Sequence, residues 1–544
     1  MKLILNLIKK NLWQYVIGTM FSMGAGTCGA LVIKQIHGAL KGGLDSQQFI
    51  MEFGLYLAGS VILGLIGSQI LTKISARNLK ELTVSLSKKI LRAPYRNIEI
   101  EQDKIIPILT TDLARIGSTA AQMPDIITSV FILLGCFIYM LTISLPMTLI
   151  GIGIFVVNML MITFLLPLLR SHEDDAKDLR YKLFKQLKAM VSGLKELSFK
   201  KKLRQSYVNQ LIAKTIDQRS ALQVKNTLLI NSFGKLENLM VMIALGVAVA
   251  YAQGTELMKS GEFVEFLAIA IFLVTPMRKV NGFLRVIHRT TMAIGQIESL
   301  GVQLSGYQPK ATKKIPVDGW SSKDPIISFR EITHTYESEE EHESFEMGPI
   351  SFDAYENETV FIIGGNGSGK TTLIKLLTGL YAPQSGSLIY KNHPITEEYL
   401  DNYQNTISPL FSDDFVFDIL YHIDDDILES QGQEYLDYLE LSKKVKIVDQ
   451  KYTTTNLSFG QKKRLNLITG LLENKDIYVF DEWAANQDPY FKTKFYEEIL
   501  PKLKQAGKTI FVISHDDSYF FMADRKIKLR DGKKVDVPEA ELIG

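Results

Sequence analysis

The chain has 544 residues, of which 46% are hydrophobic and 22% are charged, and its formal net charge is +2. This length exceeds that of one compact domain, so we expect at least two domains. The balanced charge argues against a nucleic-acid-binding protein, which would need a strongly basic surface. The first half alternates apolar runs with basic segments, whereas the second half has the composition of a soluble α/β protein.

Four uncharged runs in the first half are long enough to cross the hydrocarbon core of a bilayer. They are Leu12–Ile33, Phe53–Thr72, Ile126–Ser144 and Leu145–Leu169. Two further runs, at about 227–252 and 263–282, are apolar but interrupted by charged residues. A buried helix pair in a soluble domain is the alternative for these two, but the preceding spans leave no soluble core for it. The sequence therefore predicts an all-α membrane domain of six helices over residues 1–304.

Lysine and arginine indicate how the spans are oriented. They gather at the N-terminus and in the two long connections, residues 73–124 and 170–226, and the short connections have almost none. By the positive-inside rule, the N-terminus, both long connections and everything after the sixth span are cytoplasmic. The start MKLILNLIKK could belong to a signal peptide, but no small-residue cleavage site ends it and further spans follow. We interpret it as a retained first helix.

Charged residues inside the weaker spans are candidates for the substrate path, because ionisable groups are costly in lipid and usually face the bundle interior. Snorkelling to the lipid head groups is the alternative. The two cysteines lie inside apolar spans and are interpreted as small core residues, not as a disulfide or metal site. The candidates for the substrate path are Lys235, Glu237, Arg278 and Lys279. The two cysteines are Cys28 and Cys136.

A polar segment rich in proline, lysine and serine, residues 305–325, is typical of a linker, and a soluble domain is expected over 326–544. There, ETVFIIGGNGSGKTTLIKLL predicts a strand, a glycine-rich turn and a helix with the spacing G-x-x-x-x-G-K-T. In such a loop, backbone N–H groups surround phosphate oxygens, the lysine reaches the outer phosphates and the threonine hydroxyl binds Mg²⁺. The predicted nucleotide-binding residues are Gly364, Asn366, Gly367, Ser368, Gly369, Lys370, Thr371 and Thr372.

Two further apolar strands end in chemically useful residues. The strand at 477–480 leads into Asp481-Glu482, and the strand at 509–513 leads into Ser514-His515. Because carboxyl ends of parallel strands meet at one edge of a sheet, we expect these side chains beside the phosphate loop. Asp481 is predicted to bind Mg²⁺, Glu482 to act as general base on the attacking water, and His515 to contact the γ-phosphate. A solvated acidic loop and a structural histidine are the alternatives. Together the motifs predict an α/β P-loop nucleoside triphosphatase.

The stretch NLSFGQKKR, residues 456–464, predicts the start of a basic helix whose first turn is suited to an anion. With it, GGNGSGKTTL, DEWAANQDPYFKTKFYEEILPKLK and ISHDDSYF resemble the ATP-binding cassette (ABC) superfamily, with the cassette joined to a six-helix exporter membrane domain. These stretches and GLKEL at 193–197 look like the bacterial cyclic-peptide and siderophore-precursor exporters, the group that includes the pyoverdine and syringomycin exporters.

The resemblance implies ATP-driven export of a peptide-like molecule from the cytoplasm across the bacterial inner membrane, by a homodimer of half-transporters. A lipid or multidrug flippase is the alternative substrate class. A non-transporting ATP-gated membrane switch is an alternative from another class of protein. The intact Glu482 and His515 disfavour this alternative. The expected ligands and partners are ATP, Mg²⁺, a second copy of the chain, membrane lipid and the substrate, and no nucleic acid.

The resemblance also assigns residues. In this superfamily the signature sequence faces ATP bound by the second cassette, so Ser458, Gly460 and Gln461 are expected to contact the partner's nucleotide. Asp488 matches the D-loop aspartate, and Tyr336 matches the aromatic that stacks on adenine, with an exposed strand tyrosine as the alternative.

Two positions depart from the family pattern. Ser412 stands where the family has a glutamine that contacts Mg²⁺, and Phe459 stands where most members have glycine. Gln404 is too early in the chain to replace that glutamine. We expect segments Ile106–Arg115 and Gly193–Lys202 to transmit closure of the cassettes to the spans.

Overall fold

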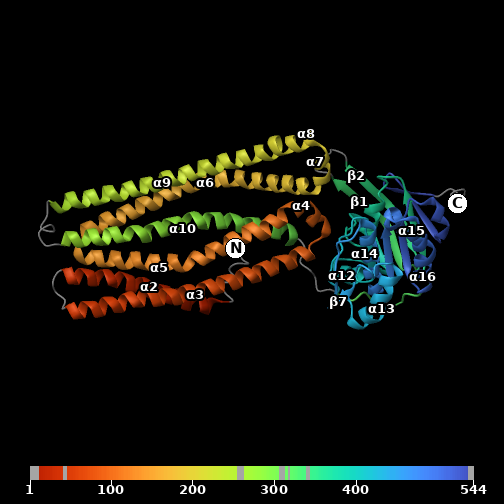
Figure 1. Ribbon diagram of the computed structural model, residues 1–544, viewed down its shortest axis with the longest axis horizontal. Helices are drawn as coiled ribbons and strands as arrows, with labels where there is room; N and C mark the ends of the chain where they lie inside the picture. The colour runs from red at the N-terminus through yellow and green to blue at the C-terminus, as the bar shows by residue number, and fades with distance from the viewer. Residues whose placement is uncertain are drawn as a thin grey trace. The chain divides into compact units, whose positions relative to one another are not determined.

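The computed structural model describes residues 11–40, 46–253, 262–305, 313–316, 319–337 and 344–536. The chain divides into two compact units, which Figure 1 draws as ribbons. The first unit comprises Met1–Ala93 and Asn97–Gly306, and the second comprises Pro94–Arg96 and Tyr307–Gly544. Each unit is described separately below.

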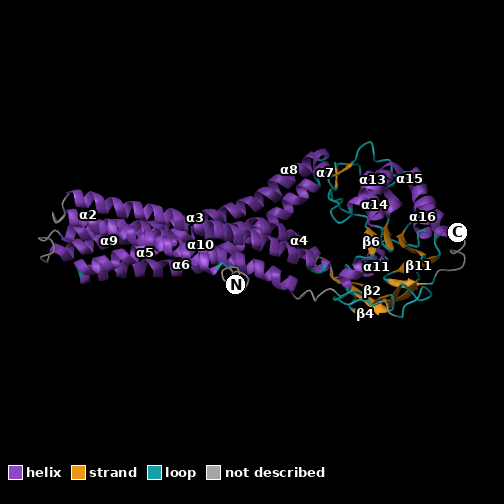
Figure 2. Ribbon diagram, turned by 90° about the horizontal axis from the view of Figure 1, so that it is seen from below, coloured by secondary structure: helices purple, strands orange, loops and turns teal. Residues whose placement is uncertain are grey.

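The first unit consists of helices and short turns in its described residues (Figure 2). Six of the helices have 29 to 48 residues, which exceeds the length of about 20 residues that spans a bilayer. They are α2 (Leu12–Leu40), α3 (Ser46–Arg92), α5 (Leu113–Ile143), α6 (Leu145–Ser192), α9 (Ala213–Gln253) and α10 (Glu262–Ser305). The shorter ones are α4 (Tyr95–Pro107), the π-helical turn η1 (Ile108–Asp112), α7 (Leu194–Phe199), α8 (Lys201–Ser206) and the π-helical turn η2 (Tyr207–Ile212).

The long helices carry the predicted spans. In the described part of the chain, five candidate spans satisfy both length and hydropathy, and a shorter apolar stretch, Thr148–Phe164, lies in α6. The protein is therefore a multi-pass membrane protein. Cys28 and Cys136 are both free thiols, half-buried and buried respectively, in agreement with the core positions expected for them.

Small residues let the helix α2 approach its neighbours closely. A Cβ atom at Gly18 would come within 2.7 Å of Leu71 on α3, and one at Gly26 would come within 2.7 Å of Phe131 on α5. Helices in lipid gain little from hydrophobic burial, so close backbone packing stabilises their association.

Two of the charged residues predicted inside the weaker spans have polar partners on the neighbouring helix. Glu237 of α9 accepts a hydrogen bond from the side-chain amide of Asn281 on α10 at 2.9 Å, and Arg278 of α10 donates to the side-chain oxygen of Asn238. Asn281 is only 1% exposed, so this polar contact is inside the bundle. The side chains of Lys235 and Lys279 are exposed. A role of these residues in the substrate path stays a prediction.

The first long connection turns at residues 93–94, and Ile106–Arg115, one of the two segments expected to transmit closure, is helical. Its role in coupling stays a prediction. That segment continues from α4 through η1 into α5 without a break. Its apolar residues lie at helical spacing, and Ile108 and Leu113 pack with Leu82 and Leu86 of α3, which keeps the segment helical. The second expected segment does contain a turn, because Gly193 separates α6 from α7.

The segment at the first turn belongs to the second unit. The guanidinium of Arg96 donates to the backbone carbonyl of Thr335 at 3.3 Å. The ring of Tyr95 lies 6.4 Å from the ring of Tyr381, and the ammonium of Lys375 lies 5.5 Å from the Tyr95 ring centroid. Pro94–Arg96 is thus the short stretch of the first long connection that packs within the second unit.

The second unit contains a six-stranded sheet in the order β12-β11-β3-β10-β9-β6 and a four-stranded antiparallel sheet in the order β2-β1-β4-β5. In the larger sheet all strands are parallel except β12. It is formed by β3 (Thr359–Gly364), β6 (Ile407–Leu410), β9 (Ile477–Asp481), β10 (Thr509–Ile513), β11 (Arg525–Arg530) and β12 (Lys533–Val535). The smaller sheet is formed by β1 (Ile327–Glu337), β2 (Ser344–Ala354), β4 (Ser385–Tyr390) and β5 (His393–Pro394), and β7 (Ile447–Val448) pairs separately with β8 (Lys451–Tyr452).

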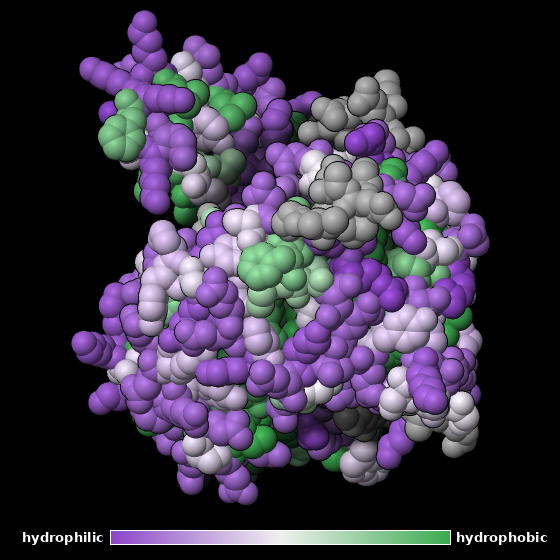
Figure 3. All heavy atoms as spheres, turned by 90° about the vertical axis from the view of Figure 1, so that its right-hand side faces the viewer, coloured by the Kyte–Doolittle hydropathy of each residue, from purple (hydrophilic) through white to green (hydrophobic). Residues whose placement is uncertain are grey.

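The larger sheet has an apolar core on each face, because successive strand residues point to opposite sides. Phe361 and Ile363 of β3 pack with residues of α13, α14 and α16, whereas Val360 and Ile362 pack with α11 and the smaller sheet. The surface of the molecule seen in Figure 3 is mostly hydrophilic. The helices and helical turns are α11 (Lys370–Leu377), α12 (Leu400–Gln404), α13 (Asp425–Tyr438), α14 (Phe459–Glu473), η4 (Trp483–Asn486), α15 (Pro489–Lys494), η5 (Phe495–Ile499), α16 (Leu500–Gln505) and η6 (Asp517–Met522).

Candidate nucleotide-binding site

The phosphate loop joins the carboxyl end of β3 to the start of α11. Gly364 has φ of +158°, and a Cβ atom there would lie 2.5 Å from the backbone oxygen of Leu529, so only glycine fits. Gly369 has φ of +99° and precedes the first residue of α11. The loop therefore directs its backbone toward the N-terminus of α11, the geometry that favours anions. Of the other predicted loop residues, Asn366, Gly367 and Thr371 are exposed and Thr372 is half-buried.

Two buried polar groups of this loop fit phosphate oxygens. The ammonium of Lys370 donates to the backbone carbonyls of Gly364 at 3.0 Å and Gly365 at 2.9 Å, so it folds over its own loop. Burial lowers the pKa of Lys370, and the nearby charges of Glu482 and Asp481 oppose that shift. The hydroxyl of Ser368 is buried and has no hydrogen-bond partner in the described part of the chain. Phosphate oxygens would satisfy both groups.

A buried carboxylate lies at the same edge of the sheet. Asp481 is the last residue of β9, and its neighbour Ile513 in β10 pairs also with Ile362 of β3, so the three strands end together. Burial raises the pKa of Asp481 to about 6, helped by the negative charges of Glu482 and Asp413. The ammonium of Lys463 and the backbone N–H of Ser412 act in the opposite direction. A bound cation would relieve the cost of this buried charge.

The residues predicted as general base and γ-phosphate contact lie side by side. Oε1 of Glu482 is 3.1 Å from Nε2 of His515, and both side chains are partly exposed. Glu482 has φ of +49°, a left-handed conformation that is uncommon for a residue with a side chain. This conformation directs the chain away from β9 at Glu482 and into η4. The fold thus brings Asp481, Glu482 and His515 to the edge at which the phosphate loop begins.

Lys463 is a buried cation that our sequence analysis missed. It lies on α14, is 5% exposed, and donates from its ammonium to the backbone carbonyl of Glu482 at 2.9 Å. Burial lowers the pKa of Lys463, while Asp481, Glu482 and Asp414 raise it. The available sequence signal was the basic run QKKR that directly follows the signature, in which the second lysine falls on the buried face of the helix.

Ser412 lies in the loop that follows β6. The backbone N–H of Ser412 contacts the Asp481 carboxylate, which places Ser412 beside the expected Mg²⁺ ligand. Gln404 is held elsewhere, because its side-chain amide donates to the carbonyls of Gly379 at 3.2 Å and Thr378 at 3.4 Å. Asp414 is a half-buried acid in this region: loss of solvation raises its pKa to about 7, opposed by a backbone hydrogen bond from Phe411.

The signature residues form the N-terminus of α14. Ser458 caps the helix, and its hydroxyl and backbone exchange hydrogen bonds with Gln461 in a capping box. The carbonyl of Gly460 accepts from the side chain of Gln487 at 3.2 Å, and Asp488 caps α15 through the backbone N–H of Phe491 at 3.0 Å. Within the described residues, no hydrogen bond or ion pair joins these positions to the phosphate loop. They form a helix N-terminus that is separate from the phosphate loop.

Two further predictions concern the side chain of Tyr336 and the ligands of Mg²⁺. Tyr336 lies in β1 and its backbone pairs with Phe345 of β2, but its side chain is outside the described part of the structure. Across the described residues, no group of three or more histidine, cysteine or acidic side chains is arranged to hold a metal ion. The predicted ligands Thr371 and Asp481 instead suit Mg²⁺, which usually takes one or two protein ligands and completes its shell with phosphates and water.

The parallel sheet, the phosphate loop and the acidic strand end define an ATP-binding P-loop ATPase joined to a helical membrane domain. The family model described as the ABC transporter transmembrane region matches residues 12–277, and the model described as ABC transporter matches residues 347–485. The chain is 30% identical over 472 residues to the ATP-binding protein SyrD of Pseudomonas syringae pv. syringae. The aligned region covers 84% of this chain and 82% of the relative. The chain belongs to the ABC transporter family.

Other similarities agree with this assignment. Over 204 residues the chain is 32% identical to the energy-coupling factor transporter ATP-binding protein EcfA of Malacoplasma penetrans (strain HF-2), covering 34% of this chain and 68% of that protein. A solved structure of a bacterial Atm1-family ABC exporter with ATP bound has a similar fold, with a TM-score of 0.77, 97% of this chain and 96% of that chain covered, and 14% identity. The predicted fold class is confirmed. The protein is an ATP-driven ABC exporter, and its half-transporter architecture implies dimerisation.

Proposed function

We propose that the protein works as a homodimer that exports a cyclic or otherwise modified peptide, such as a siderophore precursor, across the bacterial inner membrane. The similarity to SyrD over 84% of the chain supports this substrate class, together with the GLKEL stretch and the signature region. The basic residues of the two long connections support a cytoplasmic N-terminus and a cytoplasmic ATPase unit.

The contact of 3.1 Å between Glu482 and His515 is the observation that carries the catalytic proposal. Glu482 accepts a proton from the attacking water, and His515 orients this carboxylate and contacts the γ-phosphate. Lys370, Ser368 and the backbone N–H groups of the loop hold the phosphates. Thr371 and Asp481, with Ser412 beside them, would hold Mg²⁺, which neutralises phosphate charge when bound. A switch that only bound nucleotide would need no such base.

Dimerisation completes the site in this proposal. Ser458, Gly460 and Gln461 lie at a helix N-terminus whose first residue, Ser458, is exposed, and within the described residues no bond joins them to the phosphate loop of their own chain. We infer that they bind ATP held by the second copy. Asp488 lies in the adjoining turn, bonded to the start of α15. Tyr336 is proposed to stack on adenine, as the family pattern implies.

The function is tested by ATP-dependent uptake into inverted membrane vesicles, with cell extract as the source of substrate and mass spectrometry of the retained peptides. Glu482→Gln should retain ATP binding, reduce hydrolysis by about 100-fold or more, and abolish uptake. Glu497→Gln is the matched control, because Glu497 is an exposed acid on η5. Uptake that persists in Glu482→Gln would exclude ATP-driven export through this site, and retention of lipid instead of peptide would replace the substrate class.

The dimer is tested with Lys370→Ala and Ser458→Arg in dimers purified through two different affinity tags. If each site combines the phosphate loop of one copy with the signature of the other, placing the two changes on different chains leaves one intact site. Placing both on the same chain leaves none. Occluded ATP per dimer should therefore be about one and zero, respectively. The reverse result would show that each chain builds its site alone.

A further inference from the structure

A cavity of about 360 Å³ lies in the membrane unit between α5, α6 and α9. Among the described residues that line it, four are cationic, namely Arg115, Lys177, Arg180 and Arg219, and none is acidic. These residues lie about two to three helical turns beyond the predicted spans of their helices, in the long helix extensions of the membrane unit. The size falls within the range of about 300–1,000 Å³ that is usual for small-molecule sites.

The positive charge of this cavity is only partly compensated. Asp112, which is fully buried, lies 3.3 Å from the guanidinium of Arg180 and 3.9 Å from that of Arg115. Among the described residues, Asp112 thus pairs with two of the four cations, Arg115 and Arg180. Within the described residues, Lys177 and Arg219 form no ion pair, and the exposed Asp175 and Asp178 of α6 do not line the cavity.

Unsatisfied hydrogen-bonding groups lie beside these charges. In the described part of the chain, Nε of Arg180 and Oδ2 of Asp112 are buried without a hydrogen-bond partner. The Asp112–Arg180 pair therefore fixes the Arg180 guanidinium without using all of its donors. Converging cations with spare donors are costly when left alone and are stabilised by an anion. Guanidinium groups match the planar geometry of carboxylates and the tetrahedral oxygens of phosphates.

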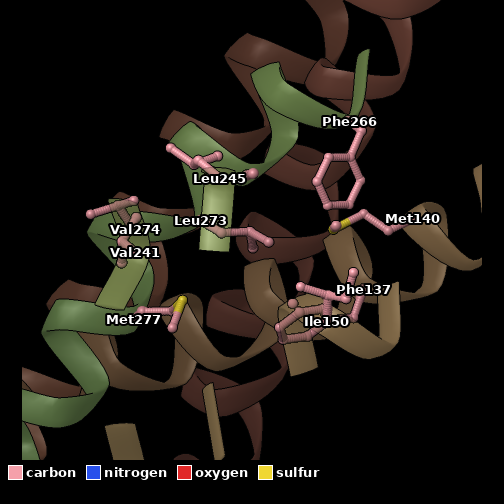
Figure 4. A pocket seen from close by; sticks show the side chains of 11 residues that line it. Phe137, Met140, Ile150, Val241, Leu245, Phe266, Leu273, Val274 and Met277 are labelled. Carbon is pink, nitrogen blue, oxygen red and sulfur yellow. The ribbon is translucent and has the colours of Figure 1, made fainter. Parts of the chain in front are cut away.

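Gln223, Asn226 and Thr227 are polar residues of the lining, so the apolar lining residue nearest the membrane indicates where the rest of the ligand would lie. Ile230 also lines the cavity and belongs to the predicted span at 227–252. A second pocket, between α5, α6, α9 and α10, is lined only by apolar side chains that include Phe137, Met140 and Leu273 (Figure 4). Its volume of about 50 Å³ is too small for a substrate, and it has no polar group that would orient one. The basic cavity is therefore the stronger ligand site.

We propose that this basic cavity binds the anionic head group, a carboxylate or a phosphate, of an amphipathic ligand whose apolar part lies along the spans. The inference rests on the proposed export function, because the ligand is taken to be the exported molecule. Lys177 and Arg219 are its most informative residues, since neither stabilises Asp112. Removing Arg115 or Arg180 would instead leave a buried carboxylate without its partner and would destabilise the fold.

The test measures binding to the nucleotide-free full chain in phosphatidylcholine nanodiscs by isothermal titration calorimetry, with empty nanodiscs subtracted. The two probes are N-dodecanoyl-L-glutamate and its uncharged diamide. The acid should bind about tenfold or more tightly than the diamide, and the double variant Lys177→Gln/Arg219→Gln should remove that preference. Lys214→Gln is the matched control, because Lys214 is an exposed lysine of α9 that does not line the cavity.

Competition identifies the source of the anion. Phosphatidylglycerol in the nanodisc should displace the acid probe if a lipid head group is the ligand, and inorganic phosphate should displace it if a free phosphate is. If neither competes, the acidic group belongs to the substrate. Equal binding of acid and diamide, or an unchanged preference in the double variant, would overturn the proposal. Because no nucleotide is present, that failure would leave the test with Glu482→Gln unaffected.

Discussion

The ammonium nitrogen of Lys463 lies 2.9 Å from the backbone carbonyl oxygen of Glu482, and it connects the signature helix α14 to the end of strand β9. The same nitrogen lies 3.5 Å from the carbonyl of Trp483. Both carbonyls belong to the turn in which Glu482 takes its left-handed conformation. Lys463 therefore holds the turn that directs the proposed base toward His515.

Replacing Lys463 with methionine should lower kcat for ATP hydrolysis by about tenfold and change KM for ATP by less than about twofold. The reason is that the turn at Glu482 loses a buried charge-assisted donor while the phosphate loop stays intact. Steady-state ATPase kinetics of the purified full chain give both parameters. Lys462→Met is the control, because Lys462 is exposed on the same helix. Equal losses in the two variants would show that Lys463 does not position Glu482.

Asp414 should make stability depend on pH. The pKa of its carboxyl is about 7 in the folded protein, compared with an ordinary value of 3.8. The folded state therefore binds this proton more tightly, so the stability contribution is fully present below about pH 4 and is lost as pH rises through about 7. Asp414→Asn, which is neutral throughout, should gain in Tm relative to the wild type as pH rises, and the difference should increase by about 3 °C or more between pH 5 and pH 8.

Thermal unfolding of the full chain in detergent, followed by intrinsic fluorescence, measures this difference in Tm. Asp481 titrates in the same direction, but it is present in both proteins and its effect cancels in the comparison. Asp418→Asn serves as the control, because Asp418 is an exposed acid in the same loop. A constant difference in Tm between pH 5 and pH 8 would contradict the assignment to Asp414.

Ser412→Ala should reduce ATP hydrolysis less than Thr371→Ala or Asp481→Asn. Ser412 contacts the Asp481 carboxylate through its backbone N–H, and this contact survives removal of the hydroxyl. The other two changes remove expected Mg²⁺ ligands. ATPase activity measured across a Mg²⁺ titration separates the cases, because loss of a ligand shifts the half-maximal Mg²⁺ concentration upward. A shift in Ser412→Ala as large as that in Asp481→Asn would show that the hydroxyl is a ligand.

Features that depend on short-range spacing were predictable from the sequence alone. The phosphate loop is one example, because glycine at Gly364 and Gly369 permits backbone conformations that few other residues adopt. The strand before Asp481 and the strand before His515 are others, since apolar runs of this length with β-branched residues form buried strands. Parallel pairing then brings their ends together without further information.

Only the tertiary structure identified the partners that come from distant parts of the chain. The sequence contains two adjacent lysines after the signature, and only the packing of α14 against β9 shows that Lys463 is buried and that Lys462 is exposed. Likewise, only the packing of Ile108 against α3 shows that the segment Ile106–Arg115 is helical and partly buried. The charge of the basic cavity likewise depends on Arg115, Arg180 and Arg219 meeting from three helices. Burial and electrostatic interaction depend on distance in space, which local sequence patterns do not encode.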